Sequence, residues 1–244
     1  MGMDRGRIVS KKKFFDHFKE LNSRIFLSLF NLLVFFVFIY FNYSSVYDIL
    51  IQPLIQAGYS ESDLFAFTIY EGFQVKLINS LYVSLISSLP INLIILGYFF
   101  QPAIENLSRL KFLIFLIISI TLFYVGLLIS YELIPHAIKF FLSFNESDFI
   151  LRTQNYFQLV FRIALLFGVT FEIPLVIYFL LNRGIIDISK IKKLRKEIFL
   201  VILIFSAIIT PTGDPVSLFA LTIPLYLFIE FVIFLNIKSK NNET

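Results

Sequence analysis

Residues 112–134 read FLIFLIISITLFYVGLLISYELI, an apolar run with one charged side chain in 23 positions. A helix needs about 20 predominantly apolar residues to cross the hydrocarbon core of a bilayer. Five further apolar runs lie on either side of this one, at residues 25–41, 77–98, 157–181, 198–209 and 218–237. The sequence therefore predicts an all-α membrane protein, a single integral membrane domain over residues 1–244 with six transmembrane helices, the last two of them short.

The composition agrees with this class. Apolar residues make up 58% of the chain and the mean hydropathy is +0.83, whereas soluble domains are about 45–50% apolar. Cysteine is absent, which excludes disulfides and thiolate chemistry. The sequence has no glycine-rich phosphate loop and no basic patch interleaved with aromatic residues, so nothing in it supports nucleic-acid binding.

The first and fifth runs need separate arguments. Residues 25–41 follow a basic stretch, as a secretory signal peptide would, but the run is longer than about 15 residues and no small-residue cleavage site follows it. We therefore expect a retained helix. Residues 198–209 reach only about 18 Å as a helix. A re-entrant segment, a buried helix and a short span in a thinned bilayer are all compatible with that length.

The distribution of Lys and Arg decides in favour of six crossings. The segments at alternate helix ends hold 17 of the 21 Lys and Arg residues, the opposite segments hold 3, and Arg162 lies within a run. Acidic residues divide almost evenly between the two sides. This asymmetry is typical of the positive-inside rule. It places both termini on the cytoplasmic, matrix or stromal side, and it requires the fifth run to cross.

Charged residues inside a bilayer are expensive and are therefore candidates for function. Glu172 lies mid-span in the motif FEIP at 171–174. Such a carboxylate is expected to bind a partner group or a cation, or to stay protonated, and a structural hydrogen bond between helices is the alternative. Arg162 lies about 15 Å away along the axis, near the outer end, where snorkelling favours a structural role. For Glu230, in the last run, both a functional and a structural role remain open.

Glu20 and Arg24, just before the first run, are four residues apart, which suits an ion pair on one face of a helix. Catalytic chemistry has little support. The two histidines, His17 and His136, are assigned to opposite sides of the membrane, and no His-Glu-x-x-His or Gly-x-Ser-x-Gly motif is present. We predict no enzyme, no metal and no cofactor.

Several motifs resemble those of the TatC family, the multi-span core of the twin-arginine protein translocase. Their order and spacing cover nearly the whole chain. They are residues 16–25 (DHFKELNSRI), Lys76, Leu89-Pro90, Phe99, Pro102, Arg109, residues 167–174 (FGVTFEIP), residues 210–214 (TPTGD) and residues 223–226 (IPLY).

This resemblance implies six helices with the last two short, arranged around a concave face. It implies binding of the twin-arginine signal peptides of folded cargo on the cytoplasmic side, and transport driven by the proton-motive force with small single-span partner subunits. Glu20 matches the acid that receives the signal arginines, and Arg24, Phe99 and Arg109 belong to the same binding region. Glu172 matches a buried carboxylate associated with partner helices, and Asp214 matches an acid of the external loop.

Two positions depart from the family pattern. Asn22 stands where the N-terminal signature has Arg, and Ser108 stands where a Glu precedes Arg109. The second change removes one of two acids expected to hold the guanidinium pair, and bidentate Arg–carboxylate contacts are the strong kind. Glu105 is a candidate substitute.

The sequence also allows two other function classes. A secondary transporter or channel would use Glu172 and Arg162 as a midplane site, but the sequence has no inverted repeat. An intramembrane enzyme would need a nucleophile that is not found. The AT-rich type of composition, and a chain without a targeting presequence, suggest an organellar membrane such as the mitochondrial inner membrane, with a bacterial inner membrane as the alternative.

Overall fold

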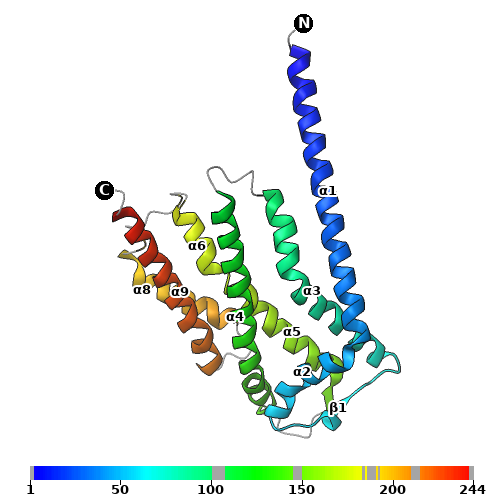
Figure 1. Ribbon diagram of the computed structural model, residues 1–244. Coiled ribbons are helices and arrows are strands. Elements are labelled where there is room, and N and C mark those ends of the chain that lie inside the picture. The colour runs from blue at the N-terminus through cyan, green and yellow to red at the C-terminus, as the bar shows by residue number, and fades with distance from the viewer. Residues whose placement is uncertain are drawn as a thin grey trace. The chain divides into compact units, whose positions relative to one another are not determined.

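The computed structural model describes residues 3–100, 108–144, 150–182, 185, 191, 193–209 and 215–241, and nearly all of them are helical (Figure 1). Four apolar stretches are long enough to span a membrane. They lie in α1 (Met3–Phe41), α3 (Glu71–Phe100), α4 (Arg109–Leu142), and the pair α5 (Thr153–Thr170) and α6 (Ile173–Asn182). The all-α membrane fold is confirmed.

Two helices correspond to the fifth and sixth predicted runs. Helix α8 (Arg195–Ile209) has 15 residues, a length of about 22 Å at a rise of 1.5 Å per residue. Helix α9 (Pro215–Asn241) contains the whole of the predicted run at 218–237 and extends beyond it at both ends. Helix α8 is thus shorter than the four long apolar stretches.

The first span faces its surroundings with large apolar side chains. On α1, Phe26 is 72% exposed, Phe30 55% and Phe38 67%. A continuous exposed apolar surface of this kind is expected against lipid and not against water. The helix ends at Phe41, where Asn42 donates from both its backbone and its side chain to the Phe38 carbonyl and so satisfies the exposed end of the helix.

The chain divides into two compact units. The first contains residues 1–46 and 76–120, which include all of α1, most of α3 and the start of α4. The second contains residues 47–75 and 121–244.

The segment between α1 and α3, of which residues 47–75 belong to the second unit, is structured. It forms α2 (Tyr43–Gln56), a short 3-10 helix (Glu61–Asp63) and strand β1 (Leu64–Phe65), which pairs in parallel with β2 (Leu151–Arg152). The hydroxyl groups of Tyr131 and Tyr156 donate to the carbonyls of Ile49 and Leu50, both at 2.7 Å. These bonds tie α2 to the outer ends of α4 and α5.

Helix α4 and the fourth span differ from the predicted runs. Helix α4 continues through Pro135 to Leu142 because its extra turns bury Ala137 and Ile138. The fourth span is broken into α5 and α6 at Phe171 and Glu172, because Pro174 lacks the N–H group that a continuous helix would use there. The rest of the span stays helical on both sides of the break.

Helices α4 and α5 cross at two glycines. A Cβ atom on Gly126 would lie 2.8 Å from the Phe167 carbonyl oxygen and 3.0 Å from the Cα atom of Gly168. Small residues at helix crossings allow this close approach of two backbones in membranes. Gly168, part of the 167–174 motif, therefore fixes the distance between α4 and α5.

Candidate functional site

The predicted ion pair near the start of the first span is confirmed. Arg24 donates from Nη2 to Glu20 Oε1 at 2.7 Å and from Nη1 to the Ile95 carbonyl on α3 at 3.0 Å. The Glu20 side chain is 47% exposed and that of Arg24 is 28% exposed. Arg24 therefore joins α1 to α3 and holds the Glu20 carboxylate at the surface of the first unit. The bond to Ile95 was not predictable from spacing, since 71 residues separate the two.

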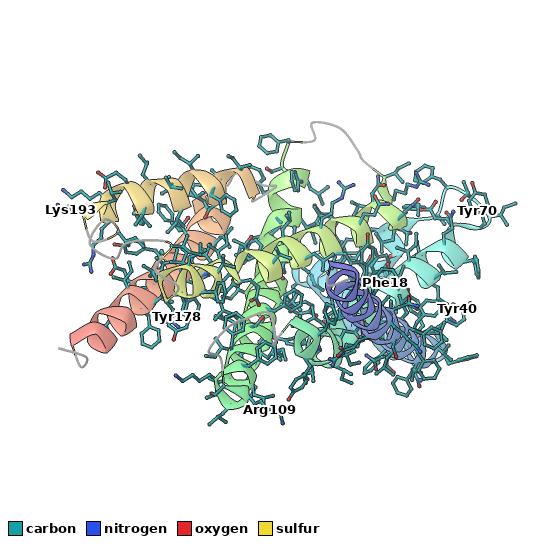
Figure 2. The ribbon with its side chains drawn as sticks, turned by 90° about the horizontal axis from the view of Figure 1, so that it is seen from above. Phe18, Tyr40, Tyr70, Arg109, Tyr178 and Lys193 are labelled. Atoms are coloured by element: carbon teal, nitrogen blue, oxygen red, sulfur yellow. The ribbon has the colours of Figure 1, made fainter. Side chains whose placement is uncertain are left out.

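Ser108, one of the two departures from the family pattern, begins α4. Its Oγ accepts a hydrogen bond from the Lys111 backbone N–H at 3.3 Å, the contact by which an N-cap serine satisfies an orphan donor of the first turn. Arg109 follows as the first helical residue, exposed at the start of α4 (Figure 2). A cation at a helix N-terminus opposes the helix dipole, so the helix gains nothing from Arg109. Phe99, near the end of α3, is half-buried in the same unit.

Polar side chains also join α1 and α3 deeper within the span. Asn31 donates to Asn92 Oδ1 at 2.9 Å, and Asn92 donates to the Ser88 hydroxyl at 3.1 Å. Interhelical bonds of this type stabilise membrane helix pairs by about 0.6–2 kcal/mol each.

At the opposite ends of these two helices, Lys76 of α3 contacts Tyr40 of α1. The Lys76 ammonium lies 4.4 Å from the centre of the Tyr40 ring, within cation–π range. Asn79 donates to the Tyr43 hydroxyl at 2.9 Å. Burial raises the pKa of Tyr43, and the bond from Asn79 only partly opposes this. Tyr43 is therefore neutral at physiological pH, and its oxygen acts as the acceptor.

Glu172 lies in the break of the fourth span and is half-buried. Its carbonyl accepts hydrogen bonds from the backbone N–H groups of Leu175 and Val176 at 3.0 and 3.1 Å, so it begins the first turn of α6. Non-helical backbone at membrane depth is tolerated where it is buried in protein or lines a cavity.

Residues 16–224 match the model of a protein family described as Sec-independent protein translocase protein (TatC). The chain belongs to the TatC family. The matched range includes Glu20, Arg24, Phe99, Arg109 and Glu172 at the positions described above. It also includes Asp214, which lies outside the described residues, as does Glu105.

Two TatC relatives match over most of their length. The chain is 32% identical to the TatC protein of Desulforapulum autotrophicum, covering 93% of this chain and 85% of the relative. It is 29% identical to that of Aquifex aeolicus, covering 90% and 92%. A crystal structure of a twin-arginine translocase receptor TatC matches with a TM-score of 0.69 at 28% identity, covering 90% of this chain and 99% of that one. The chain is thus a membrane protein of a protein-transport family.

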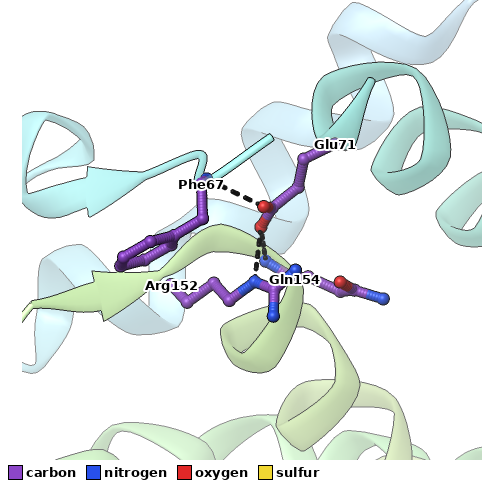
Figure 3. A network of polar contacts seen from close by, with 4 residues as sticks. All are labelled: Phe67, Glu71, Arg152 and Gln154. Carbon is purple, nitrogen blue, oxygen red and sulfur yellow. Dashed lines mark hydrogen bonds and ion pairs between the residues drawn. The ribbon is translucent and has the colours of Figure 1, made fainter. Parts of the chain in front are cut away.

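One buried carboxylate of this TatC family member was missed by the sequence analysis. Glu71, at the start of α3 and 0% exposed, accepts hydrogen bonds from the backbone N–H groups of Phe67 and Gln154 at 2.9 and 3.2 Å (Figure 3). Its Oε1 also pairs with Arg152 Nε at 3.1 Å, and the Arg152 guanidinium lies 5.8 Å from the centre of the Phe67 ring. The network joins the β1 and β2 segments, and 81 residues separate its charged partners.

Glu230, which the sequence left open, has two partners in the second unit. The Tyr226 hydroxyl donates to Glu230 Oε1 at 2.9 Å, and Arg195 Nη2 lies 3.3 Å from Oε2. These contacts join α8 to α9 and support the structural interpretation of Glu230. Tyr226 is part of the IPLY motif and lies one turn before Glu230. The pairing of Arg195 with Glu230 could not be predicted from the sequence.

Proposed function

We propose that this chain is the receptor and core subunit of a twin-arginine translocase. It binds the signal peptides of folded cargo proteins at Glu20 and supports their transport by the proton-motive force. Family membership and the resemblance to a translocase receptor support this proposal, and they favour it over a secondary transporter. The observation that carries it is the exposed Glu20 carboxylate, oriented by an Arg24 that is itself anchored to α3.

The chemistry of Glu20 fits a guanidinium ligand. A carboxylate offers two oxygens and about four acceptor positions, so the bond from Arg24 to Oε1 does not exhaust its capacity. A signal arginine would approach from solvent and form the charge-assisted contacts that carboxylates make best. Phe99 and Arg109 lie in the same unit, and we propose that they complete the binding region.

Glu172 is proposed as the contact for small single-span partner subunits, because a half-buried carboxylate at a helix break offers a polar group to a neighbouring transmembrane helix. Asp214 is proposed to act in the external loop. The composition supports a mitochondrial or other organellar inner membrane as the location. The relatives named above are bacterial, so a bacterial inner membrane is the alternative, and fractionation of cells expressing a tagged chain distinguishes them.

Crosslinking tests signal reception at Glu20. We expect Glu20→Gln to reduce crosslinking of a photoreactive twin-arginine signal peptide in membranes by about tenfold or more, because a hydrogen bond to a charged group contributes about 1.5–3 kcal/mol. Changing the two signal arginines to lysines should have a similar effect. Glu197→Gln, which neutralises an exposed carboxylate in the first turn of α8, is the matched control and should bind normally. Wild-type crosslinking that does not depend on the arginines would contradict the proposal.

Glu105 is tested in the same assay. If Glu105 replaces the acid missing at Ser108, Glu105→Gln should weaken crosslinking by several-fold, and Ser108→Glu should restore it in that background. The reason is that a second carboxylate adds a second charge-assisted contact to the arginine pair. Normal binding by Glu105→Gln, alongside a loss in Glu20→Gln, would show that one acid is sufficient in this chain.

A further inference from the structure

A cavity of about 500 Å³ lies between the last turns of α4 and the first turns of α5. Ile138 and Leu142 line it from α4, one turn apart, and Leu159 lines it from α5. Polar side chains in the lining include Arg152, Asn155, Gln158 and Arg162. Residues 155, 158, 159 and 162 have the spacing of one helix face, so α5 presents amides, a leucine and a guanidinium to one space.

The charge of this cavity is unusual for its side of the membrane. Outside the cytoplasmic segments the sequence has four Lys or Arg residues, namely Lys76, Lys139, Arg152 and Arg162. Two of the four line this one cavity. Lys76 lies over an aromatic ring, and Arg152 uses its Nε atom on Glu71. Because Glu71 balances the charge of Arg152, Arg162 supplies the uncompensated positive charge among the described residues of the lining.

Arg162 forms no ion pair with any of the described residues. It lies within the apolar stretch Thr153–Asn182, its side chain is exposed, and no carboxylate of a described residue lies within ion-pair distance of it. Near the outer end of a span a long cationic side chain reaches toward the membrane surface, where the phosphate groups of lipids lie. Arg binds phosphate with two parallel hydrogen bonds, so a phosphate group suits it well.

We propose that this cavity binds the headgroup of an anionic phospholipid of the outer leaflet. The Arg162 guanidinium and the remaining N–H groups of Arg152 hold the phosphodiester, while Asn155 and Gln158 bind headgroup hydroxyls or ester oxygens. The first carbons of an acyl chain lie against Ile138, Leu142 and Leu159. The volume is within the range of sites for ligands of this size. Free phosphate would leave the apolar wall unused, which favours the lipid.

Native mass spectrometry of the full chain, purified in neutral detergent, tests the site. With dioleoyl phosphatidylglycerol we expect one retained lipid per chain, and weaker retention of dioleoyl phosphatidylcholine by about tenfold. Arg162→Gln should remove this selectivity. Arg162→Lys should keep part of it, because the charge remains but the planar fork is lost. Lys139→Gln, an exposed cation on α4 outside the lining, should behave as wild type.

Three outcomes would overturn the proposal. Equal retention of the two lipids by the wild type would show that no anion site exists. Inorganic phosphate displacing the lipid at equal concentration would indicate a site for the ion alone. Glu146 and Asp148 belong to residues 145–149, which lie outside the described chain. If selectivity emerged only after neutralising both, Arg162 would already have a protein partner.

Discussion

Replacing Gly126 by leucine is expected to leave little folded protein. A Cβ atom at this position would already lie 2.8 Å from the Phe167 carbonyl oxygen and 3.0 Å from the Cα atom of Gly168. Both contacts are with the backbone of α5, so no side-chain rotation can relieve them, and overpacked cores lose stability even where side chains can adjust. We expect the yield of monodisperse protein to fall by about tenfold or more, as unfolded chains are degraded.

The matched control is Gly72→Leu. A Cβ atom on Gly72 meets nothing within 4 Å, so the same substitution there should leave the yield and the thermal midpoint near the wild-type values. Size-exclusion chromatography of both variants in the same detergent gives the comparison. If Gly126→Leu were as monodisperse as the control, the close crossing of α4 and α5 would not be required for the fold.

The second large effect is expected from Glu71→Ala. The substitution leaves the backbone N–H groups of Phe67 and Gln154 and the Nε atom of Arg152 without their acceptor. Breaking a buried ion pair costs about 3–5 kcal/mol, and Arg152 is 37% exposed, so we expect about 3 kcal/mol. The fall in the free energy of unfolding should appear as a lower thermal midpoint and as faster hydrogen exchange in residues 64–71 and 150–154.

Glu61→Ala provides the control for that prediction. Glu61 belongs to the same external segment, but its side chain is exposed, so removing it should change the unfolding free energy by less than about 0.5 kcal/mol. Equal effects of the two substitutions would mean that the carboxylate of Glu71 does not stabilise the pairing of β1 with β2.

The helices of this protein were largely predictable because lipid imposes one simple demand, a long apolar run, and the runs are visible in the sequence. The first run ends at residue 41 and α1 ends at Phe41, while the fifth run and α8 both end at Ile209. The extension of α4 to Leu142 was not predicted, because it depends on burial of Ala137 and Ile138 by distant segments. The break at Glu172 had a local signal in Pro174, but a proline in a membrane helix also permits a continuous, bent helix.

Some contacts of the candidate site are likewise predictable from the sequence, and others are not. The ion pair of Glu20 and Arg24 follows from a spacing of four residues, so the sequence predicts it directly. The contact of Arg24 with Ile95 and that of Glu71 with Arg152 depend on which helices become neighbours, and hydropathy does not contain that information. The capping role of Ser108 depends on where α4 begins, and that boundary is not set by the apolar run at 112–134.

The contacts between α1 and α3 have a mechanical consequence. Position 24 meets 95, 31 meets 92 and 40 meets 76, so the partner on α3 moves back along the chain as the position on α1 advances, as expected for two antiparallel helices in contact over the length of the span. Sliding one helix by a single turn, about 5.4 Å, would break all of them at once. We therefore expect the two helices to act as one stiff lever, so that a force applied at Glu20 moves the opposite end of the pair instead of being absorbed between the helices.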